Sequence, residues 1–208
     1  MYRDDRWTFC GGTLISDRHV LTAAHCLSGE TARWIHVIVG DHNWKNVATG
    51  TAHAVKSIQS HNKYNQNTLD FDYAFLTLNE RVSIEAKHQP ACLPAAGSSQ
   101  FKDSRLQRNH LTVSGWGALS QNGGGPSSLH SVDVPFVKWK LCRNLYRKEG
   151  IGVSSRMVCA GNVRNGGIDA CFGDSGGIYR SIPISFNYYN KSYFINTIQY
   201  YRTILISG

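Results

Sequence analysis

The sequence predicts an all-β protein, folded as a barrel or a sandwich. Short runs that are apolar, or that alternate apolar with polar residues, recur along the chain, and Gly, Asp, Asn or His bound each run. Helical periodicity is weak outside residues 140–148. Hydrophobic residues make up 41% of the chain and charged residues 17%, as is ordinary for a folded domain. The 208 residues are enough for one large domain or two small lobes.

The predicted strands fall into two groups. The first group lies within residues 12–24, 34–43, 52–62 and 73–78. The second group lies within residues 110–117 and 131–137. A segment rich in Pro, Ala and Ser, near residues 88–108, separates them and is the candidate linker. We therefore expect two β-rich parts, the second of which carries the one predicted helix.

Charge and hydropathy argue against several classes of protein. The net charge is +8 and the pI about 9.3, yet the basic residues are scattered, with residues 138–148 nearest to a cluster. Aromatic residues are not interleaved with them as in RNA-binding proteins. No run approaches the roughly 18 apolar residues of a membrane helix. We expect a monomer with no nucleic-acid or membrane partner. A heparin-binding module is a weaker alternative, which rests on the net charge alone.

The six cysteines, at positions 10, 26, 92, 142, 159 and 171, include no CxxC pair. Zinc ribbons and fingers need two such pairs. The intervals 10–26 and 142–159 instead suggest two disulfides that close loops of roughly 15 residues, each stabilising the fold by about 3 kcal/mol. Disulfides form in oxidising compartments, so we expect secretion, although the first residues, "MYRDDRWTFC", carry no apolar signal-peptide core.

Separate segments carry the groups that serine-based amide hydrolysis requires: a base, an acid that orients the base, and N–H donors for the oxyanion. His25 ends a β-type run directly beside Cys26. Asp72 precedes the apolar run 73–78, where a carboxylate is costly unless it is hydrogen-bonded or paired. Asp70 competes for the same role, although its polar neighbours favour a solvated side chain.

The segment "GDSGG", residues 173–177, surrounds one hydroxyl with glycines. Glycine permits a tight turn in which successive backbone N–H groups converge on one point. Gly173 and Ser175 are then candidates to donate two N–H groups to an oxyanion, while Ser175 also offers its hydroxyl. Each signal is weak alone, because most histidines are surface residues and a glycine-rich string is often only a turn.

The signals gain strength from their order. His25, Asp72 and Ser175 are separated by 47 and 103 residues. Seven motifs accompany them along the chain: "CGGTLIS", "VLTAAHC", "DYAFLTL", "ACLP", "SGWG", "MVCAG" and "DACFGDSGG". On these motifs the chain resembles the chymotrypsin/trypsin-like serine endopeptidases over about residues 9–177.

The resemblance implies two six-stranded antiparallel β-barrels of the trypsin type. The first would occupy about residues 9–96 and the second, which is incomplete, about 105–177, followed by a divergent tail at 178–208. It implies a secreted enzyme that hydrolyses peptide bonds in proteins or peptides and that protein protease inhibitors can block. Some members hold calcium in a loop, but no carboxylate follows Asp41 in "WKNVATGTAH", so we predict no metal site and no cofactor.

The resemblance also implies a role for each site residue. His25 would be the general base, Asp72 the residue that orients it, and Ser175 the nucleophile. Gly173 and Ser175 would form the oxyanion hole. Asp169 matches the acid on the floor of a trypsin-type pocket, which favours Arg or Lys just before the scissile bond. The expected disulfides are Cys10–Cys26 and Cys142–Cys159.

Two departures from the family pattern bear on the expected activity. No Ile-Val-Gly-Gly-type segment precedes "CGG", so Asp174 lacks the α-amino group with which its family counterpart pairs, and would be either exposed or buried without compensation. After Gly177 the family's pocket wall and closing helix have no counterpart, which leaves Cys92 and Cys171 without their usual partners. We therefore expect a fragment or mis-spliced form of a secreted protease, and the alternative is a catalytically inactive homologue that acts by binding proteins.

Overall fold

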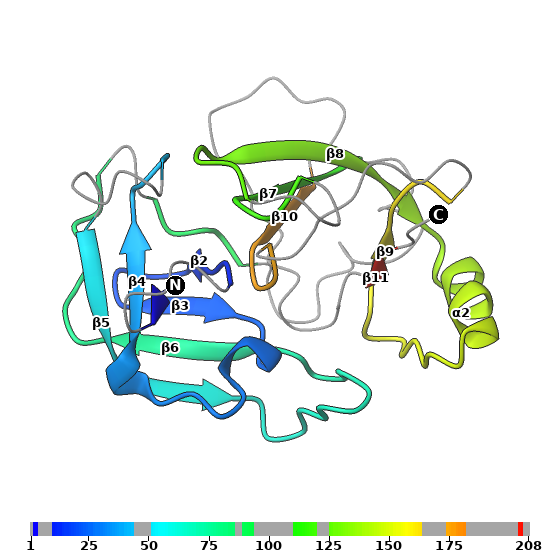
Figure 1. Ribbon diagram of the computed structural model, residues 1–208, viewed down its shortest axis with the longest axis horizontal. Coiled ribbons are helices and arrows are strands. Elements are labelled where there is room, and N and C mark those ends of the chain that lie inside the picture. Colours follow the sequence, from blue (N-terminus) through cyan, green and yellow to red (C-terminus); the bar gives the residue numbers. More distant parts are fainter. Residues whose placement is uncertain are drawn as a thin grey trace.

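The computed structural model describes residues 2–3, 10–43, 51–85, 89–93, 110–119, 125–163, 174–181 and 204–205. These residues form mainly β-strands, arranged as two sheets that lie side by side (Figure 1). The first sheet, coloured blue to cyan, and the second, coloured mostly green to yellow, form separate lobes. The predicted fold class is confirmed: the chain is a double β-barrel of the trypsin type, with the second barrel incomplete.

The first lobe is a six-stranded sheet with the order β1-β4-β5-β6-β3-β2, in which every described pairing is antiparallel. Along β6 buried and half-buried residues alternate, as the alternating sequence predicts, and Ala74, Leu76 and Leu78 are fully buried. Together with Ile35 they belong to a core whose buried members lie between Cys10 and Val82, some in strands and some in the connecting segments. The strands are β1 (Tyr2–Arg3), β2 (Thr13–Leu14), β3 (His19–Thr22), β4 (Ile35–Val39), β5 (Thr51–Ser60) and β6 (Ala74–Leu78).

The second lobe is a five-stranded sheet with the order β10-β7-β8-β9-β11. Its pairings are antiparallel except between β9 and β11, which run parallel and so depart from the expected all-antiparallel barrel. Two strands of the sheet lie beyond the expected boundary at Gly177: β10, which pairs with β7, and β11, which pairs with β9. The strands are β7 (His110–Gly115), β8 (His130–Val137), β9 (Cys159–Ala160), β10 (Ile178–Ser181) and β11 (Ile204–Leu205).

The predicted helix is present as α2 (Trp139–Lys148). It buries Cys142 and packs Trp139 and Tyr146 against a small core that includes Met157, while its basic side chains stay exposed. The Cys142–Cys159 disulfide ties α2 to β9. Two 3-10 helices, η1 (His25–Leu27) and η2 (Ala32–Trp34), belong to the first lobe. No helix in the described ranges is long and apolar enough to cross a membrane.

The lobes contact one another at several points along their seam. The carbonyl of His42 in the first lobe accepts hydrogen bonds from the Leu129 amide at 2.8 Å and from the Trp116 indole at 3.1 Å. Further contacts join Asp70 to Arg156 and the segment around residue 11 to the turn that precedes β10. The candidate catalytic residues lie beside these last two contacts.

Candidate active site

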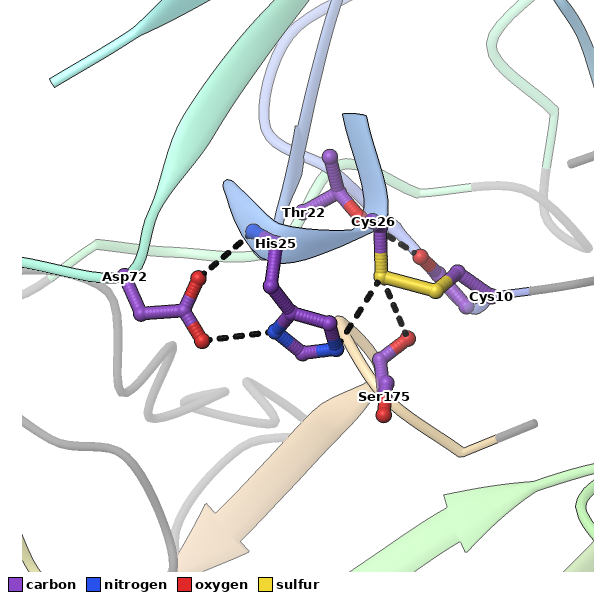
Figure 2. Close-up of a disulfide and its surroundings, with 7 residues drawn as sticks. Cys10, Thr22, His25, Cys26, Asp72 and Ser175 are labelled. Atoms are coloured by element: carbon purple, nitrogen blue, oxygen red, sulfur yellow. Dashed lines mark hydrogen bonds and ion pairs between the residues drawn. A yellow bond between two sulfur atoms is a disulfide. The ribbon is translucent and has the colours of Figure 1, made fainter. Parts of the chain in front are cut away.

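His25 begins η1, three residues after β3 ends. The expected disulfide Cys10–Cys26 is present, and both cysteines are buried, so the residue next to His25 is tied covalently to the start of the first lobe (Figure 2). The side chain of His25 itself is 37% exposed. The imidazole is therefore anchored at its backbone yet accessible from solvent.

Sheet register brings Asp72 to His25. Strands β3 and β6 are antiparallel and pair Thr22 with Ala74, so the end of one strand lies beside the start of the other. The two residues that flank this pair, His25 and Asp72, thereby meet although 47 positions separate them in the chain. In the sequence, His25 follows the run that forms β3, and Asp72 precedes the run that forms β6. Pairing of these two runs therefore brings the two side chains together.

The carboxylate of Asp72 makes two hydrogen bonds to the same histidine. Its Oδ1 accepts the His25 backbone N–H at 2.8 Å, and its Oδ2 lies 2.7 Å from His25 Nδ1. The Asp72 side chain is only 5% exposed. Because an ionised carboxylate can only accept, the proton of the neutral ring belongs on Nδ1, which leaves Nε2 with a lone pair. That is the tautomer that a general base requires.

Asp70, the competing acid, is not solvated as the sequence suggested. Its carboxylate forms an ion pair with Arg156 of the second lobe and accepts a hydrogen bond from the Ser154 hydroxyl at 2.9 Å. These contacts, the Arg156 hydrogen bond above all, hold the pKa of Asp70 below its ordinary value despite partial burial. The prediction failed because the partner lies 86 residues away in another lobe.

The backbone around Asp70 adopts an unusual conformation. Leu69 has φ of 52° and Phe71 has φ of 53°, in the left-handed region that costs an ordinary side chain roughly 1–2 kcal/mol. Such a conformation persists only where surrounding contacts determine it. Here the Phe71 amide donates to Asp70 Oδ1 at 3.2 Å and the Tyr73 amide donates to the Phe71 carbonyl at 2.8 Å.

Ser175 lies in a tight turn directly before β10, as the glycine-rich segment predicts. The Gly177 amide closes the turn on the Asp174 carbonyl at 2.9 Å. Gly176 has φ of +79°, and a Cβ there would meet Thr22 Oγ1 at 2.3 Å, so both conformation and space require glycine. The turn also contacts the first lobe, because the Ser175 carbonyl accepts the Gly11 amide at 2.7 Å.

The turn places Ser175 on the side of the imidazole away from Asp72 (Figure 2). Cys26 Sγ contacts both groups, 3.6 Å from His25 Nε2 and 3.9 Å from the Ser175 carbonyl oxygen. A disulfide sulfur carries no hydrogen, so these are packing contacts rather than donated bonds. Within the described ranges no hydrogen bond joins the Ser175 hydroxyl to the ring, a bond that commonly tightens only when substrate is present.

The carboxylate of Asp174 occupies a cradle of glycines at the end of β7. Its Oδ1 accepts the Gly117 amide at 2.8 Å. A Cβ on Gly115 would fall 1.9 Å from Asp174 Oδ1, and one on Gly117 would fall 2.4 Å from Asp174 Cγ. Asp174 is therefore not exposed, as one expectation had it, but half-buried with its carboxylate hydrogen-bonded to the backbone. Sequence reasoning missed this role of the glycines in "SGWG", although their spacing of two was a visible signal.

Three residues of sequence interest, Asp169, Cys171 and Gly173, lie outside the described residues. Cys92 is a free, exposed cysteine in the part of the chain that the structure describes. In the described part of the chain, three side chains that can bind metals, those of Cys10, His25 and Cys26, have their potential ligand atoms within 4.8 Å of one another. Because the two cysteines share a disulfide, their sulfurs are not thiolates and cannot bind a metal as thiolates do.

Comparison with known proteins gives a consistent result. The family model described as trypsin matches residues 1–179. A trypsin of Phaedon cochleariae is 38% identical over 171 residues, which cover 81% of this chain and 63% of that protein. Trypsin 5G1 of Aedes aegypti is 38% identical over 170 residues, covering 81% and 60%. The venom serine protease Bi-VSP of Bombus ignitus is 38% identical over 185 residues, covering 86% and 49%.

The chain thus spans about three fifths of the length of the two trypsins that it matches. The family match extends over most of the residues that build both sheets and includes His25, Asp72 and Ser175. Fold, motif order and relatives agree, and on this evidence the chain belongs to the trypsin family of chymotrypsin/trypsin-like serine endopeptidases.

Proposed function

We propose that the chain is a serine endopeptidase in which Ser175 is the nucleophile, His25 the general base and Asp72 the residue that orients the base. The observation that carries this proposal is the double hydrogen bond between His25 and buried Asp72. It fixes the ring so that Nε2 points away from the carboxylate, toward the side on which Ser175 lies. Membership of the trypsin family supports the same conclusion.

The chemistry follows from these three groups. His25 Nε2 takes the proton of the Ser175 hydroxyl while Oγ bonds to the carbonyl carbon of the peptide. The Asp72 carboxylate stabilises the imidazolium that forms and keeps its orientation. The imidazolium then protonates the leaving amine, which yields an acyl-enzyme, and water activated by the same nitrogen releases the acid product.

Two further parts of the proposal concern substrate binding. The backbone N–H groups of Gly173 and Ser175 would stabilise the oxyanion, a type of contact worth about 10²–10³ in kcat for each donor. Asp169 would bind an Arg or Lys side chain before the scissile bond through a charge-assisted hydrogen bond. Comparing cleavage of matched peptide esters that carry Arg or Phe at this position tests the assignment.

The substrates would be proteins or peptides, and protein protease inhibitors would compete for the same site. The relative from Bombus ignitus is named a venom protease, and the two disulfides fit an oxidising compartment. We therefore propose that the protein acts outside the cell, as a monomer. The net charge of +8 is spread over the sequence and carries no separate proposal for nucleic acid or membrane.

Reaction of residues 1–208 with a fluorophosphonate probe tests the catalytic proposal. We expect covalent labelling that disappears in Ser175→Ala, with kcat for an ester substrate falling by on the order of 10⁶. A serine elsewhere in the second lobe, changed as Ser128→Ala, is the matched control and should label like the original chain. If the original chain folds but does not label, the inactive homologue that binds proteins becomes the better description.

A further inference from the structure

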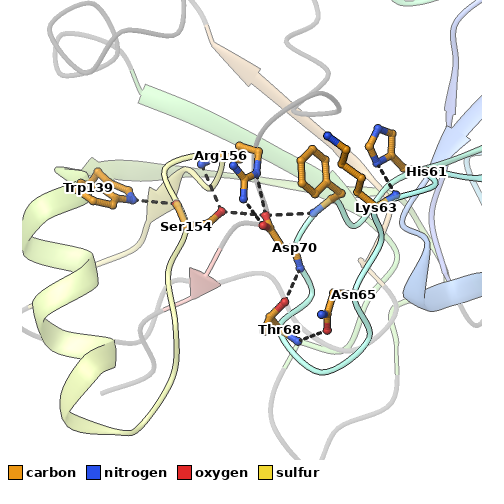
Figure 3. A network of polar contacts seen from close by, with 9 residues as sticks. His61, Lys63, Asn65, Thr68, Asp70, Trp139, Ser154 and Arg156 are labelled. Carbon is orange, nitrogen blue, oxygen red and sulfur yellow. Dashed lines mark hydrogen bonds and ion pairs between the residues drawn. The ribbon is translucent and has the colours of Figure 1, made fainter.

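A network of polar contacts around Asp70, two residues before Asp72 in the chain, joins the two lobes (Figure 3). Arg156, which follows α2 in the second lobe, donates from Nε to Asp70 Oδ1 at 3.0 Å and from a terminal nitrogen to Oδ2. Ser154 adds its hydroxyl to Oδ1 at 2.9 Å. The carbonyl of Ser154 in turn accepts the Trp139 indole N–H at 2.8 Å, which anchors this segment to α2. Asp70 is thereby held at both carboxylate oxygens by groups of the other lobe.

The same guanidinium also contacts the residue between Asp70 and Asp72. Its central carbon lies 4.4 Å from the centre of the Phe71 ring, within range of a cation–π contact. The Phe71 ring stacks on His61, with ring centres 4.6 Å apart and planes 10° apart. His61 contacts Tyr73 at the same centroid distance. His61 therefore contacts both chain neighbours of Asp72, which are Phe71 and Tyr73. Arg156 contacts Phe71 as well.

These contacts hold residues 69–71 in a backbone conformation that the segment would otherwise leave. Leu69 and Phe71 both have positive φ, which neither side chain favours, and these two residues flank Asp70. Without the ion pair, rotation of the Leu69 and Phe71 backbone toward negative φ would carry Asp72 with it. The His25 ring depends on Asp72 for its orientation, since both Asp72 oxygens bind that one residue.

We propose that Arg156 is a positioning residue of the catalytic site: acting through Asp70 and Phe71 from the other lobe, it sets the place of Asp72. This inference rests on the proposed function. Beyond that function, it makes the His25–Asp72 pair of the first lobe depend on a side chain of the second lobe. In the described contacts, Arg156 touches neither His25 nor Asp72.

A second ion pair provides a matched control. Arg81 pairs with Asp17, but both residues belong to the first lobe, and the Arg81 side chain is 70% exposed against 33% for Arg156. An exposed pair of this kind contributes little to stability. Arg81→Gln therefore removes the same chemistry, an arginine–aspartate contact, without touching the seam or the segment that precedes β6.

The experiment compares Arg156→Gln, Arg156→Lys and Asp70→Asn with Arg81→Gln in the full 208-residue chain. For an ester substrate we expect Arg156→Gln to lower kcat roughly 10- to 100-fold with little change in KM, because a displacement on the order of 1 Å is costly in catalysis. Arg156→Lys should recover only part of the loss, since lysine cannot bind both oxygens in the fork geometry. Asp70→Asn should lower kcat as much as Arg156→Gln does. The kcat of Arg81→Gln should stay within about twofold of the original chain.

A spectroscopic readout separates this proposal from the proposed function. The proton between His25 Nδ1 and Asp72 lies in a hydrogen bond of 2.7 Å and should give a strongly deshielded NMR signal, whose detection requires no substrate turnover. We expect this signal to broaden or vanish in Arg156→Gln and Asp70→Asn, to persist in part in Arg156→Lys, and to be unchanged in Arg81→Gln. If the original chain shows the signal but does not hydrolyse the substrate, the proposed function fails. The NMR comparison of the variants still tests the positioning role in that case. An unchanged signal, or unchanged kcat, in a folded Asp70→Asn or Arg156→Gln chain would overturn the role of Arg156.

Discussion

The two halves of the candidate site are held in place by different kinds of structure. His25 and Asp72 belong to the first lobe, where the pairing of Thr22 with Ala74 and the buried Cys10–Cys26 disulfide fix their approach. Ser175 belongs to a turn of the second lobe that meets the first lobe through single backbone contacts, such as the one from Gly11. One half depends on sheet register, with Arg156 positioning Asp72 just before β6, and the other half depends on a turn.

The difference predicts how each half fails. A register is shared by several consecutive residue pairs, so one surface substitution does not move His25 relative to β6. A turn depends on the conformation of one or two residues, so a single methyl group is enough to displace Ser175. The acid–base pair should therefore survive changes that disable the nucleophile, and variants of each half should separate the two.

The largest effect should come from removing the charge of the acid while leaving its shape. In Asp72→Asn the amide can donate to Nδ1, which favours the wrong ring tautomer and leaves no lone pair on Nε2. We expect kcat to fall on the order of 10⁴, the loss known for neutralising the orienting acid of such triads, with a small change in KM. Steady-state kinetics on an ester substrate measures both constants.

Asp17→Asn is the matched control for this prediction, because Asp17 lies in the same lobe but pairs with exposed Arg81. Its kcat should stay within about twofold of the original chain. A loss of similar size in both variants would mean that general destabilisation, rather than the tautomer of His25, explains the effect of Asp72→Asn.

A smaller effect should come from adding one methyl group to the turn. Gly176→Ala places a Cβ 2.3 Å from Thr22 Oγ1 and 2.6 Å from the Gly11 carbonyl, so the turn must move away from the first lobe. We expect fluorophosphonate labelling of Ser175 to slow by roughly 10²-fold. The His25–Asp72 proton signal should persist, because that half of the site does not contain the turn.

Gly150→Ala separates the clash from the backbone strain. Gly150 also has a positive φ, +73°, but a Cβ there has nothing within 4 Å. This variant should lose about 1 kcal/mol of stability in a denaturant titration and label at the original rate. Equal slowing in both alanine variants would show that strain alone, and not the contact with the first lobe, controls Ser175.

Sequence reasoning reached the parts of the site that depend on local patterns. The runs ending near His25 and beginning after Asp72 predicted β3 and β6, and the glycines of residues 173–177 predicted the turn. It failed for Asp70 and Asp174, whose partners, Arg156 and Gly117, lie far away in the chain. Polar neighbours in sequence do not reveal partners in space, so a carboxylate that looks solvated can carry a contact between lobes.

The smallest effect concerns acid stability, and it tests whether the two lobes are linked through Asp70. The pKa of Asp70 is lowered in the folded protein, chiefly by its hydrogen bond with Arg156. A carboxyl group whose folded-state pKa is depressed contributes stability above its ordinary pKa of 3.8, and that contribution is lost as the pH falls through the depressed value. Asp70 therefore helps to stabilise the fold at neutral pH and ceases to do so in acid.

Denaturant titrations of the original chain and of Asp70→Asn at neutral pH and at successive values below 3.8 measure this contribution. We expect the original chain to be the more stable at neutral pH and the gap between the two to narrow in acid, because the ionised carboxylate that Arg156 binds is then protonated. Asp17→Asn, which removes an exposed carboxylate of the first lobe, should show a smaller gap throughout. A gap for Asp70→Asn that does not change with pH would mean that its charge does not hold the lobes together, and that the aromatic contacts of Phe71 carry the link instead.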